Sequence, residues 1–304
     1  MEHTTYKKDS FKVTWSKHKD KYFLIIPFAL LFIVFTLIPV IFSIILSFTD
    51  FNGFKVPDFV GLKNYVDLLV KDDIFKIALK NTLLLAVITG PVSYIMCFVF
   101  AWLINELNPK LRAFMTLIFY APSISGNAYL IWRLIFSSDM YGYANAMLLN
   151  IGILDEPMLW LQNPLSIMPI LIVVQLWLSL GVSFLAFIAG LQNVDPSLYE
   201  AGAVDGIRNR WQELWYITLP AMKPQLMFGA VMQITTSLSL SAISINLAGF
   251  PSTEYAGHTI VTHLYDFTNN RFELGYASAI ATILFFMMLF TNLVVQKLLR
   301  KVGT

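Results

Sequence analysis

Six long apolar segments determine which fold this chain can adopt. They lie at Tyr22–Phe48, Asn81–Ile104, Ala113–Phe136, Ile167–Leu191, Leu226–Leu247 and Tyr276–Gln296. Each segment is long enough to cross a bilayer core as a helix, which takes about 20 residues. Charged residues make up only 13% of the 304 residues, whereas a soluble domain carries about twice that share. The sequence therefore predicts an all-α integral membrane protein with six transmembrane helices.

Basic residues concentrate on one side of the predicted membrane. Fourteen of the 21 Lys and Arg residues lie in the N-terminal tail, in the second and fourth loops and at the C-terminus. The third loop, Ser137–Ser166, contains no Lys or Arg. Because short cytoplasmic loops are rich in these residues, we expect both termini and the fourth loop to face the cytoplasm. The first loop departs from this pattern through Lys55, Lys63, Lys71, Lys76 and Lys80.

The chain is expected to form one membrane domain. We assign residues 1–21 to a cytoplasmic tail, 22–299 to the six-helix domain with its fourth loop at 192–225, and 300–304 to a C-terminal tail. The first apolar segment exceeds a secretory signal and lacks a small-x-small cleavage site, so we interpret it as an uncleaved span. The single cysteine excludes a disulfide framework, and a net charge of +2 gives no indication of a nucleic-acid partner.

The spans contain almost no chemistry that could drive transport. Arg133 is the only charged residue within them, and pumps or proton-coupled carriers usually need Asp, Glu or His at such positions. A phosphate-binding loop for ATP is absent from the sequence. His258 and His263 do not follow a zinc-protease pattern, and we expect both in a surface loop. We therefore predict no catalytic residue, no metal site and no cofactor in this chain, although sodium coupling through carbonyls and hydroxyls stays open.

A polar segment from Asp195 to Gly206, continuing to Pro220, interrupts the apolar pattern. Asp195 can cap a helix, and the proline that follows suits its first turn. Gly206 can end this helix in a left-handed conformation. A second short helix can begin near Asn209 and run until Pro220 forces a turn. The small side chains of residues 201–203 would let a large partner approach the backbone, so this segment is expected to be a docking surface.

The same segment resembles a known family. Glu-Ala-Gly-Ala at 200–203, Asp-Gly at 205–206 and Ile-Thr-Leu-Pro at 217–220 resemble the cytoplasmic coupling loop of ABC importer permeases, most closely the carbohydrate branch. The family commonly has Ala where this chain has Gly202. A second resemblance to sugar-importer permeases lies in the first loop, at Ser47–Asp50 and Phe59–Tyr65, where we expect a short helix over Lys63–Leu69.

The resemblance implies a type I importer fold in a bacterial plasma membrane. It also implies a second permease subunit, two cytoplasmic ATPase subunits that bind ATP and Mg²⁺, an extracytoplasmic solute-binding protein, and surrounding membrane lipid. Glu200 is expected to meet a basic residue in an ATPase cleft. The residues expected to couple to the ATPase are Tyr199, Glu200, Ala201, Gly202, Ala203, Asp205, Gly206, Leu219 and Pro220.

Two spans carry uncharged polar residues at helical spacing. Gln175, Ser179 and Ser183 fall on one face of the fourth span, and the fifth span has a broader polar stripe. Such groups suit a neutral sugar because they exchange hydrogen bonds with its hydroxyls, and the family resemblance implies a sugar site on these spans. The candidate substrate residues are Gln175, Trp177, Ser179, Gln233, Thr235, Thr236 and Ser239.

Other interpretations of these stripes stay open. Ser, Thr and Gln side chains also join helices within membranes without binding any substrate. Lys and Arg are absent from both stripes, and an anionic cargo would leave an uncompensated charge in a dry site. A polyamine, glycerol-phosphate or acidic-sugar permease remains an alternative, as does a membrane scaffold that transports nothing.

Overall fold

The computed structural model describes the backbone of residues 11–299 and the side chains from residue 21 onward. The predicted C-terminal tail, 300–304, and nearly all of the predicted tail at 1–21 therefore fall outside the described side chains. Within the described residues, five helices are long and apolar enough to cross a membrane, or six if one bent pair counts as a single span. This confirms an all-helical, multi-pass membrane protein.

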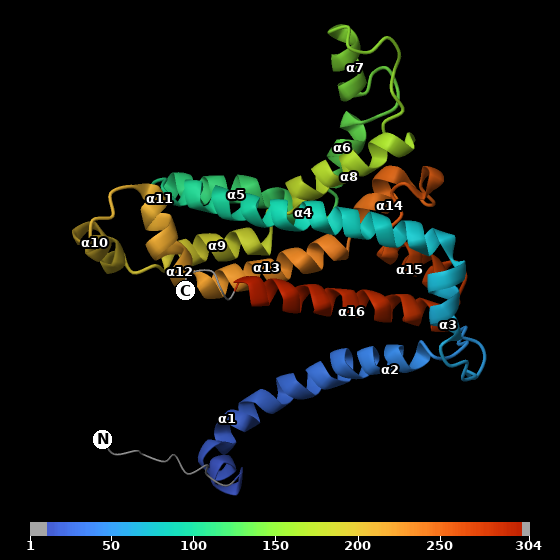
Figure 1. The fold of residues 1–304 in the computed structure, drawn as a ribbon, viewed down its shortest axis with the longest axis horizontal. Helices are drawn as coiled ribbons and strands as arrows, with labels where there is room; N and C mark the ends of the chain where they lie inside the picture. Colours follow the sequence, from blue (N-terminus) through green and yellow to red (C-terminus); the bar gives the residue numbers. More distant parts are fainter. Residues whose placement is uncertain (1–10, 300–304) are drawn as a thin grey trace.

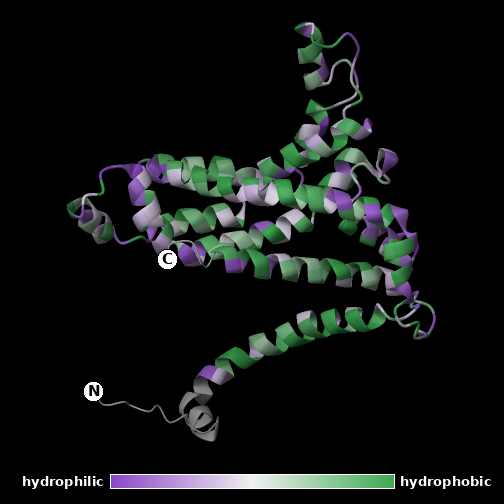
Figure 2. Cartoon of the chain, in the orientation of Figure 1, coloured by the Kyte–Doolittle hydropathy of each residue, from purple (hydrophilic) through white to green (hydrophobic). Residues whose placement is uncertain are grey.

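The first span forms an arm that leaves the bundle. It consists of α1 (Phe11–Phe32), the π-helical turn η1 (Ile33–Leu37) and α2 (Ile38–Leu46). Figure 1 shows α2 near one end of α16 while α1 runs away from every other helix. Most residues of the arm from residue 22 onward are hydrophobic (Figure 2), and none of its most apolar stretch is buried within the chain. The arm therefore depends on lipid or another subunit for its contacts.

The first loop leads into the longest helix of the bundle. A short helical segment made of α3 (Lys63–Val66) and the π-helical turn η2 (Asp67–Lys71) confirms the helix expected over 63–69. The helix α4 (Asp73–Asn105) has 33 residues and begins eight residues before the predicted start of the second span. Asp72 explains the earlier start, since its carboxylate accepts a hydrogen bond from the Phe75 amide at 2.9 Å and caps the helix.

The third span is broken, and our prediction of a continuous helix over Ala113–Phe136 was wrong. The structure has α5 (Pro109–Ile124) and α6 (Tyr129–Ile135), which differ in direction by 82°. Pro122 removes a backbone donor near the break, and Ser125 adopts an extended conformation that ends α5. The 16 residues of α5 cover about 24 Å, which is less than the roughly 30 Å of a bilayer core. Apolar content alone cannot show such a break.

The remaining spans agree in position with the prediction, but two of them are interrupted. The fourth, fifth and sixth spans consist of α8 (Pro164–Leu178), α9 (Val182–Gln192), α13 (Lys223–Leu238), α14 (Ala242–Ala248) and α16 (Leu274–Leu299). Three residues, 179–181, separate α8 from α9, and three others, 239–241, separate α13 from α14. Three spans are therefore interrupted along their length.

Short helices cover the two ends of the bundle, except α7, which projects away from it beyond α6 (Figure 1). They are α7 (Tyr143–Asn150), α10 (Pro196–Val204), α11 (Arg210–Glu213), η3 (Leu214–Thr218), α12 (Leu219–Ala221), η4 (Thr253–Tyr255) and α15 (Ile260–Asn269). In Figure 1, α10 to α12 lie at the end of the bundle opposite to α3 and α15. The polar segment predicted as a docking surface therefore occupies one end of the molecule.

Close packing among α4, α9 and α13 forms the centre of the bundle. Phe187 on α9 meets Tyr94 and Phe98 of α4 edge-on, with ring centroids 5.5 and 5.8 Å apart. Gly229 on α13 lies directly against the Phe187 ring, and a Cβ atom there would collide with it. Small residues at such crossings let membrane helices approach closely. The three helices therefore hold the surrounding elements in fixed positions.

Candidate functional site

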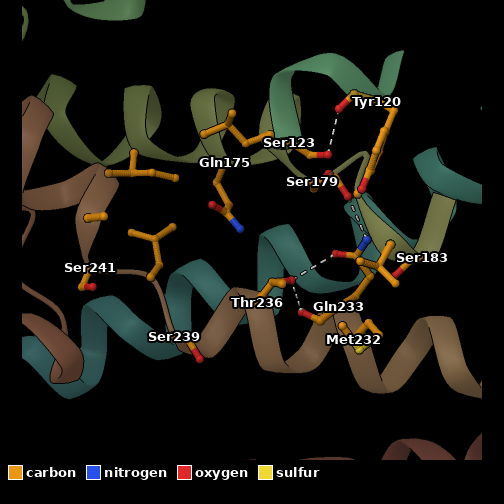
Figure 3. Close-up of a pocket in the computed structure, with 16 residues that line it drawn as sticks. Tyr120, Ser123, Gln175, Ser179, Ser183, Met232, Gln233, Thr236, Ser239 and Ser241 are labelled. Carbon is orange, nitrogen blue, oxygen red and sulfur yellow. Dashed lines mark hydrogen bonds between the residues drawn. The ribbon is translucent and has the colours of Figure 1, made fainter. Parts of the chain in front are cut away.

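A cavity of about 430 Å³ lies where the broken spans meet. Its wall combines residues from α5, from both sides of the α8–α9 break and from both sides of the α13–α14 break (Figure 3). Its polar lining residues are Tyr120, Ser123, Gln175, Ser179, Ser183, Gln233, Thr236, Ser239 and Ser241. None of the described residues that line it carries a charge. The cavity therefore offers hydroxyl and amide groups without a fixed ion.

The structure brings five of the seven candidate substrate residues together at this cavity. Gln175, Ser179, Gln233, Thr236 and Ser239 line it, from two different spans. The other two candidates do not line it. Trp177 packs edge-on against the ring of Trp132, at a centroid distance of 5.7 Å. The Thr235 hydroxyl donates to the Val231 carbonyl of its own helix at 2.9 Å.

The side chain of Gln233, on the fifth span, forms hydrogen bonds that stabilise the break in the fourth span. Its side-chain amide donates to the Ser179 carbonyl at 3.1 Å and to the Cys97 sulfur at 3.2 Å. The chain turns sharply here, with the Gly181 amide donating to the same carbonyl at 2.8 Å. An unsatisfied carbonyl at membrane depth costs several kcal/mol, so a polar partner from α13 stabilises the break. Gln233 thus has a structural role whether or not it touches a substrate.

Gln175 lines the cavity with a side-chain amide whose hydrogen-bonding capacity is unused. The residue is 7% exposed, and its carboxamide points into the cavity (Figure 3). Nothing within the described part of the chain donates to or accepts from this carboxamide. A primary amide offers two donors and an acceptor. A hydroxylated ligand in the cavity would supply partners that the protein does not.

The polar segment 195–220, at one end of the bundle, forms the two helices expected from the sequence. Asp195 accepts from the Ser197 amide at 2.9 Å and caps α10, and Gly206 follows that helix with a φ of +93°. Asn209 caps α11 through the Gln212 amide at 2.9 Å. The turn that we expected at Pro220 comes later, at Met222, because this proline occupies the first turn of α12, where its missing donor is tolerated.

The nine predicted coupling residues do not share one surface. Five are exposed, namely Glu200, Ala201, Ala203, Asp205 and Gly206, and Leu219 and Pro220 are half-buried. The half-buried Tyr199 turns its hydroxyl inward, 3.0 Å from the Thr218 hydroxyl. Gly202 is buried, and a Cβ atom there would lie 2.6 Å from the Ile217 side chain and 3.0 Å from that of Ile207. The side chains packed closely against Gly202 therefore belong to its own chain, in place of the large partner expected from the sequence.

A buried network that we did not predict lies at the end of the bundle near α3. His263 and His258 are 1% and 3% exposed, so our expectation of two surface histidines was wrong. The His263 Nε2 atom lies 3.0 Å from the Asp72 carboxylate, and its Nδ1 atom lies 3.2 Å from His258 Nε2. The Tyr276 hydroxyl donates to the same carboxylate at 3.0 Å. The network joins the start of α4 to α15 and α16.

The network shifts the acidity of its members. Burial acts to raise the pKa of Asp72, but the hydrogen bonds from His263 and the Phe75 amide outweigh it and lower the pKa to about 2. Burial, reinforced by the neighbouring His263, lowers the pKa of His258 to about 4. The Nδ1 atom of His258 is buried without a hydrogen-bond partner in the described residues. His258 is therefore neutral over the physiological range.

The fold and the cavity together define the class of protein: a helical membrane protein of the transport type, in which broken spans surround an uncharged polar cavity. Residues 98–304 match the family described as "Binding-protein-dependent transport system inner membrane component". The chain belongs to this family. The match confirms the resemblance seen at residues 200–220.

Curated relatives cover nearly the whole chain. The probable ABC transporter permease protein YesP of Bacillus subtilis (strain 168) is 34% identical over 95% of this chain and 94% of its own length. The arabinooligosaccharides transport system permease protein AraP of the same organism is 32% identical, over 93% of this chain and 90% of its own. A chain from a bacterial alginate ABC transporter, solved in complex with an alginate pentasaccharide-bound periplasmic protein, has a TM-score of 0.76 and 26% identity, covering 95% of this chain and 98% of that chain.

Proposed function

We propose that the protein is the permease subunit of an ATP-driven, binding-protein-dependent importer of a neutral sugar or oligosaccharide in a bacterial plasma membrane. The observation that carries this proposal is the uncharged cavity, rich in polar side chains, between the three interrupted spans, in a chain of this family. The arabinooligosaccharide permease among its relatives supports a carbohydrate cargo. The chain has no enzymatic role of its own in this proposal.

The lining favours a neutral cargo over an acidic one. Hydroxyls and carboxamides exchange hydrogen bonds with sugar hydroxyls without burying a charge. A uronate would bring a negative charge into a cavity whose described wall has no cation, and an unpaired buried charge is costly. The similarity to the alginate transporter keeps an acidic oligosaccharide as the second candidate, ahead of a polyamine, a glycerol phosphate or a scaffold function.

Work for import would come from partner subunits. Two cytoplasmic ATPases would bind ATP and Mg²⁺ and receive α10, whose exposed face carries Glu200, Ala201 and Ala203. The excess of Lys and Arg supports placing this end of the bundle and both termini in the cytoplasm, with α5 and α6 together counted as the third of six spans. A second permease would complete the pathway, and an extracytoplasmic binding protein would deliver the cargo at the opposite end.

Uptake by the reconstituted assembly tests this function. The full assembly in proteoliposomes, with the binding protein and ATP on their proper sides, should take up a labelled neutral oligosaccharide and should not take up an alginate oligosaccharide. Preferential uptake of the acidic oligosaccharide would replace the proposed cargo by the second candidate. Absence of ATP-dependent uptake of any solute, with all partners bound, would contradict the importer function itself.

A further inference from the structure

We propose that Arg210 with Glu106, and Trp211 with Trp102, form a clamp that transmits movement of α10 to the end of α4. This inference rests on the proposed ATP-driven function and adds Glu106 and Trp102 as positioning residues for coupling. Neither residue belongs to the polar segment that resembles the family's coupling loop. Trp102 lies in the last turn of α4 and Glu106 is the residue that caps its C-terminal end, about a hundred residues earlier in the chain.

The ionic half of the clamp centres on one guanidinium group. Arg210 places Nη2 3.0 Å from the Glu106 carboxylate and Nη1 2.9 Å from the Glu213 carboxylate. The planar fork of arginine suits two such partners at fixed angles. The hydrogen bond that Arg210 donates to Glu213 and the charge of Glu106 raise the pKa of Arg210. One cation thereby joins α11 to α4.

The aromatic half lies one helical turn away on α4. The rings of Trp102 and Trp211 have centroids 5.4 Å apart and are tilted by 53°. Trp102 and Glu106 are four residues apart, so they share one face of α4. A polar cavity of about 270 Å³ lies between the two elements, with Asn105, Tyr199 and Thr218 on its wall. Two contacts of different chemistry therefore hold α11 against the same face.

The helix α10 packs on η3, which follows directly after the helix that carries Arg210 and Trp211. Tyr199 and Gly202 attach α10 to η3 through Thr218 and Ile217. The helix α11 continues directly into η3, so a displacement of α10 moves the residue pair at 210 and 211. The chain connects α10 to α9 and α13, whereas α4 has no such covalent link to it. The clamp supplies a side-chain connection to the remaining central helix.

Further along α4, Cys97 contacts a residue that lines the transport cavity. Cys97, in the turn before Trp102, receives the amide hydrogen bond of Gln233 at 3.2 Å, and Gln233 lines the cavity. A helix segment of this length moves as a rigid body, so a shift at its end changes the cavity wall. The exposed ion pair contributes little to stability. Its removal should therefore alter coupling while the permease still folds.

The test compares transport with ATP hydrolysis in the full assembly. In Arg210→Glu and in Glu106→Arg, the amount of solute imported per ATP hydrolysed should fall several-fold. The double variant moves the cation to α4, where it still faces Glu213, and should recover most of that ratio. Lys110→Glu is the matched control, because Lys110 is an exposed cation near the end of α4, outside the docking segment, and its side chain has no carboxylate partner in the described residues. An unchanged ratio in both single variants, or no recovery in the double variant, would overturn the clamp.

A second measurement tests the clamp independently of the proposed transport function. Binding of the partner ATPases to the solubilised permease should slow amide hydrogen exchange at residues 102–106 in the wild type but not in Arg210→Gln. Exchange that responds equally in both would refute transmission through Arg210, even with transport intact. A wild-type assembly that shows the exchange response but no ATP-dependent uptake would instead contradict the proposed function and leave the clamp supported.

Discussion

The side-chain amide of Gln233 donates a hydrogen bond to the main-chain carbonyl of Ser179 over 3.1 Å, which joins the fifth span to the break in the fourth. Gln233→Leu removes this donor and leaves a buried carbonyl with fewer partners. Because the Gly181 amide still donates to this carbonyl, we expect the loss of a single hydrogen bond, about 0.5–1.5 kcal/mol in stability, seen as a lower thermal midpoint of the solubilised permease. Thr235→Val, on the exposed side of the same helix, should leave the midpoint unchanged. Equal midpoints for Gln233→Leu and the wild type would contradict a stabilising role for this hydrogen bond.

Gln175→Leu, in contrast to Gln233→Leu, should not lower the thermal midpoint. Its carboxamide has no partner in the described residues, so replacement by an apolar side chain of similar size should preserve or raise the thermal midpoint. The same change removes the amide that faces the cavity. The loss of a substrate hydrogen bond of about 1.4 kcal/mol lowers affinity roughly tenfold, measurable as a weaker half-saturation of uptake. Uptake equal to the wild type at all solute concentrations would exclude Gln175 from substrate binding.

Gly202 should tolerate little added volume. A Cβ atom would lie 2.6 Å from the end of the Ile217 side chain, which can rotate away from a methyl group but not from a branched side chain. Gly202→Ala should therefore cost little, whereas Gly202→Val should cost about 1–3 kcal/mol through overpacking. Limited proteolysis within 195–220 reports the loosened helix, and Ile217→Ala should partly restore protection in Gly202→Val. Ala203→Val, an exposed position, is the control that should stay protected.

Buried His258 gives stability a defined pH dependence. The pKa of His258 is about 4 in the folded state, against an ordinary value of 6.5. Between these values the unfolded chain takes up a proton that the folded chain refuses, so stability falls as the pH drops from 6.5 to 4, by roughly 3 kcal/mol. The lowered pKa of Asp72 adds a further loss as the pH drops from 3.8 to about 2.

His258→Gln tests this assignment, because its amide can replace the Nε2 donor without titrating. Thermal midpoints of the variant should vary less between pH 6.5 and 4 than those of the wild type. If the two pH profiles run parallel, His258 is not the group responsible.

Hydropathy and helix periodicity could predict most of the fold and part of the site. The positions of Gln175 and Ser179 on one helix face followed from their spacing of four residues, and both reach the cavity. Trp177 lies about 200° around the helix from Gln175, so the same rule should have excluded it. Pro122 is a local signal for a bend near the break at 125–128, but it does not indicate the size of the change in direction, and the burial of His263 had no local signal. His263 depends on Asp72, which is 191 residues away in the chain.

The interruption of three spans at one cavity has a mechanical consequence. At 125–128, 179–181 and 239–241, the continuous ladder of helical backbone hydrogen bonds is interrupted, so the halves of each span can tilt against each other there more easily than within an unbroken helix. The cavity can therefore widen towards one side of the membrane and narrow towards the other through small rotations at these joints. A solute bound in the cavity would lie at the centre of those rotations, where the surrounding atoms move least.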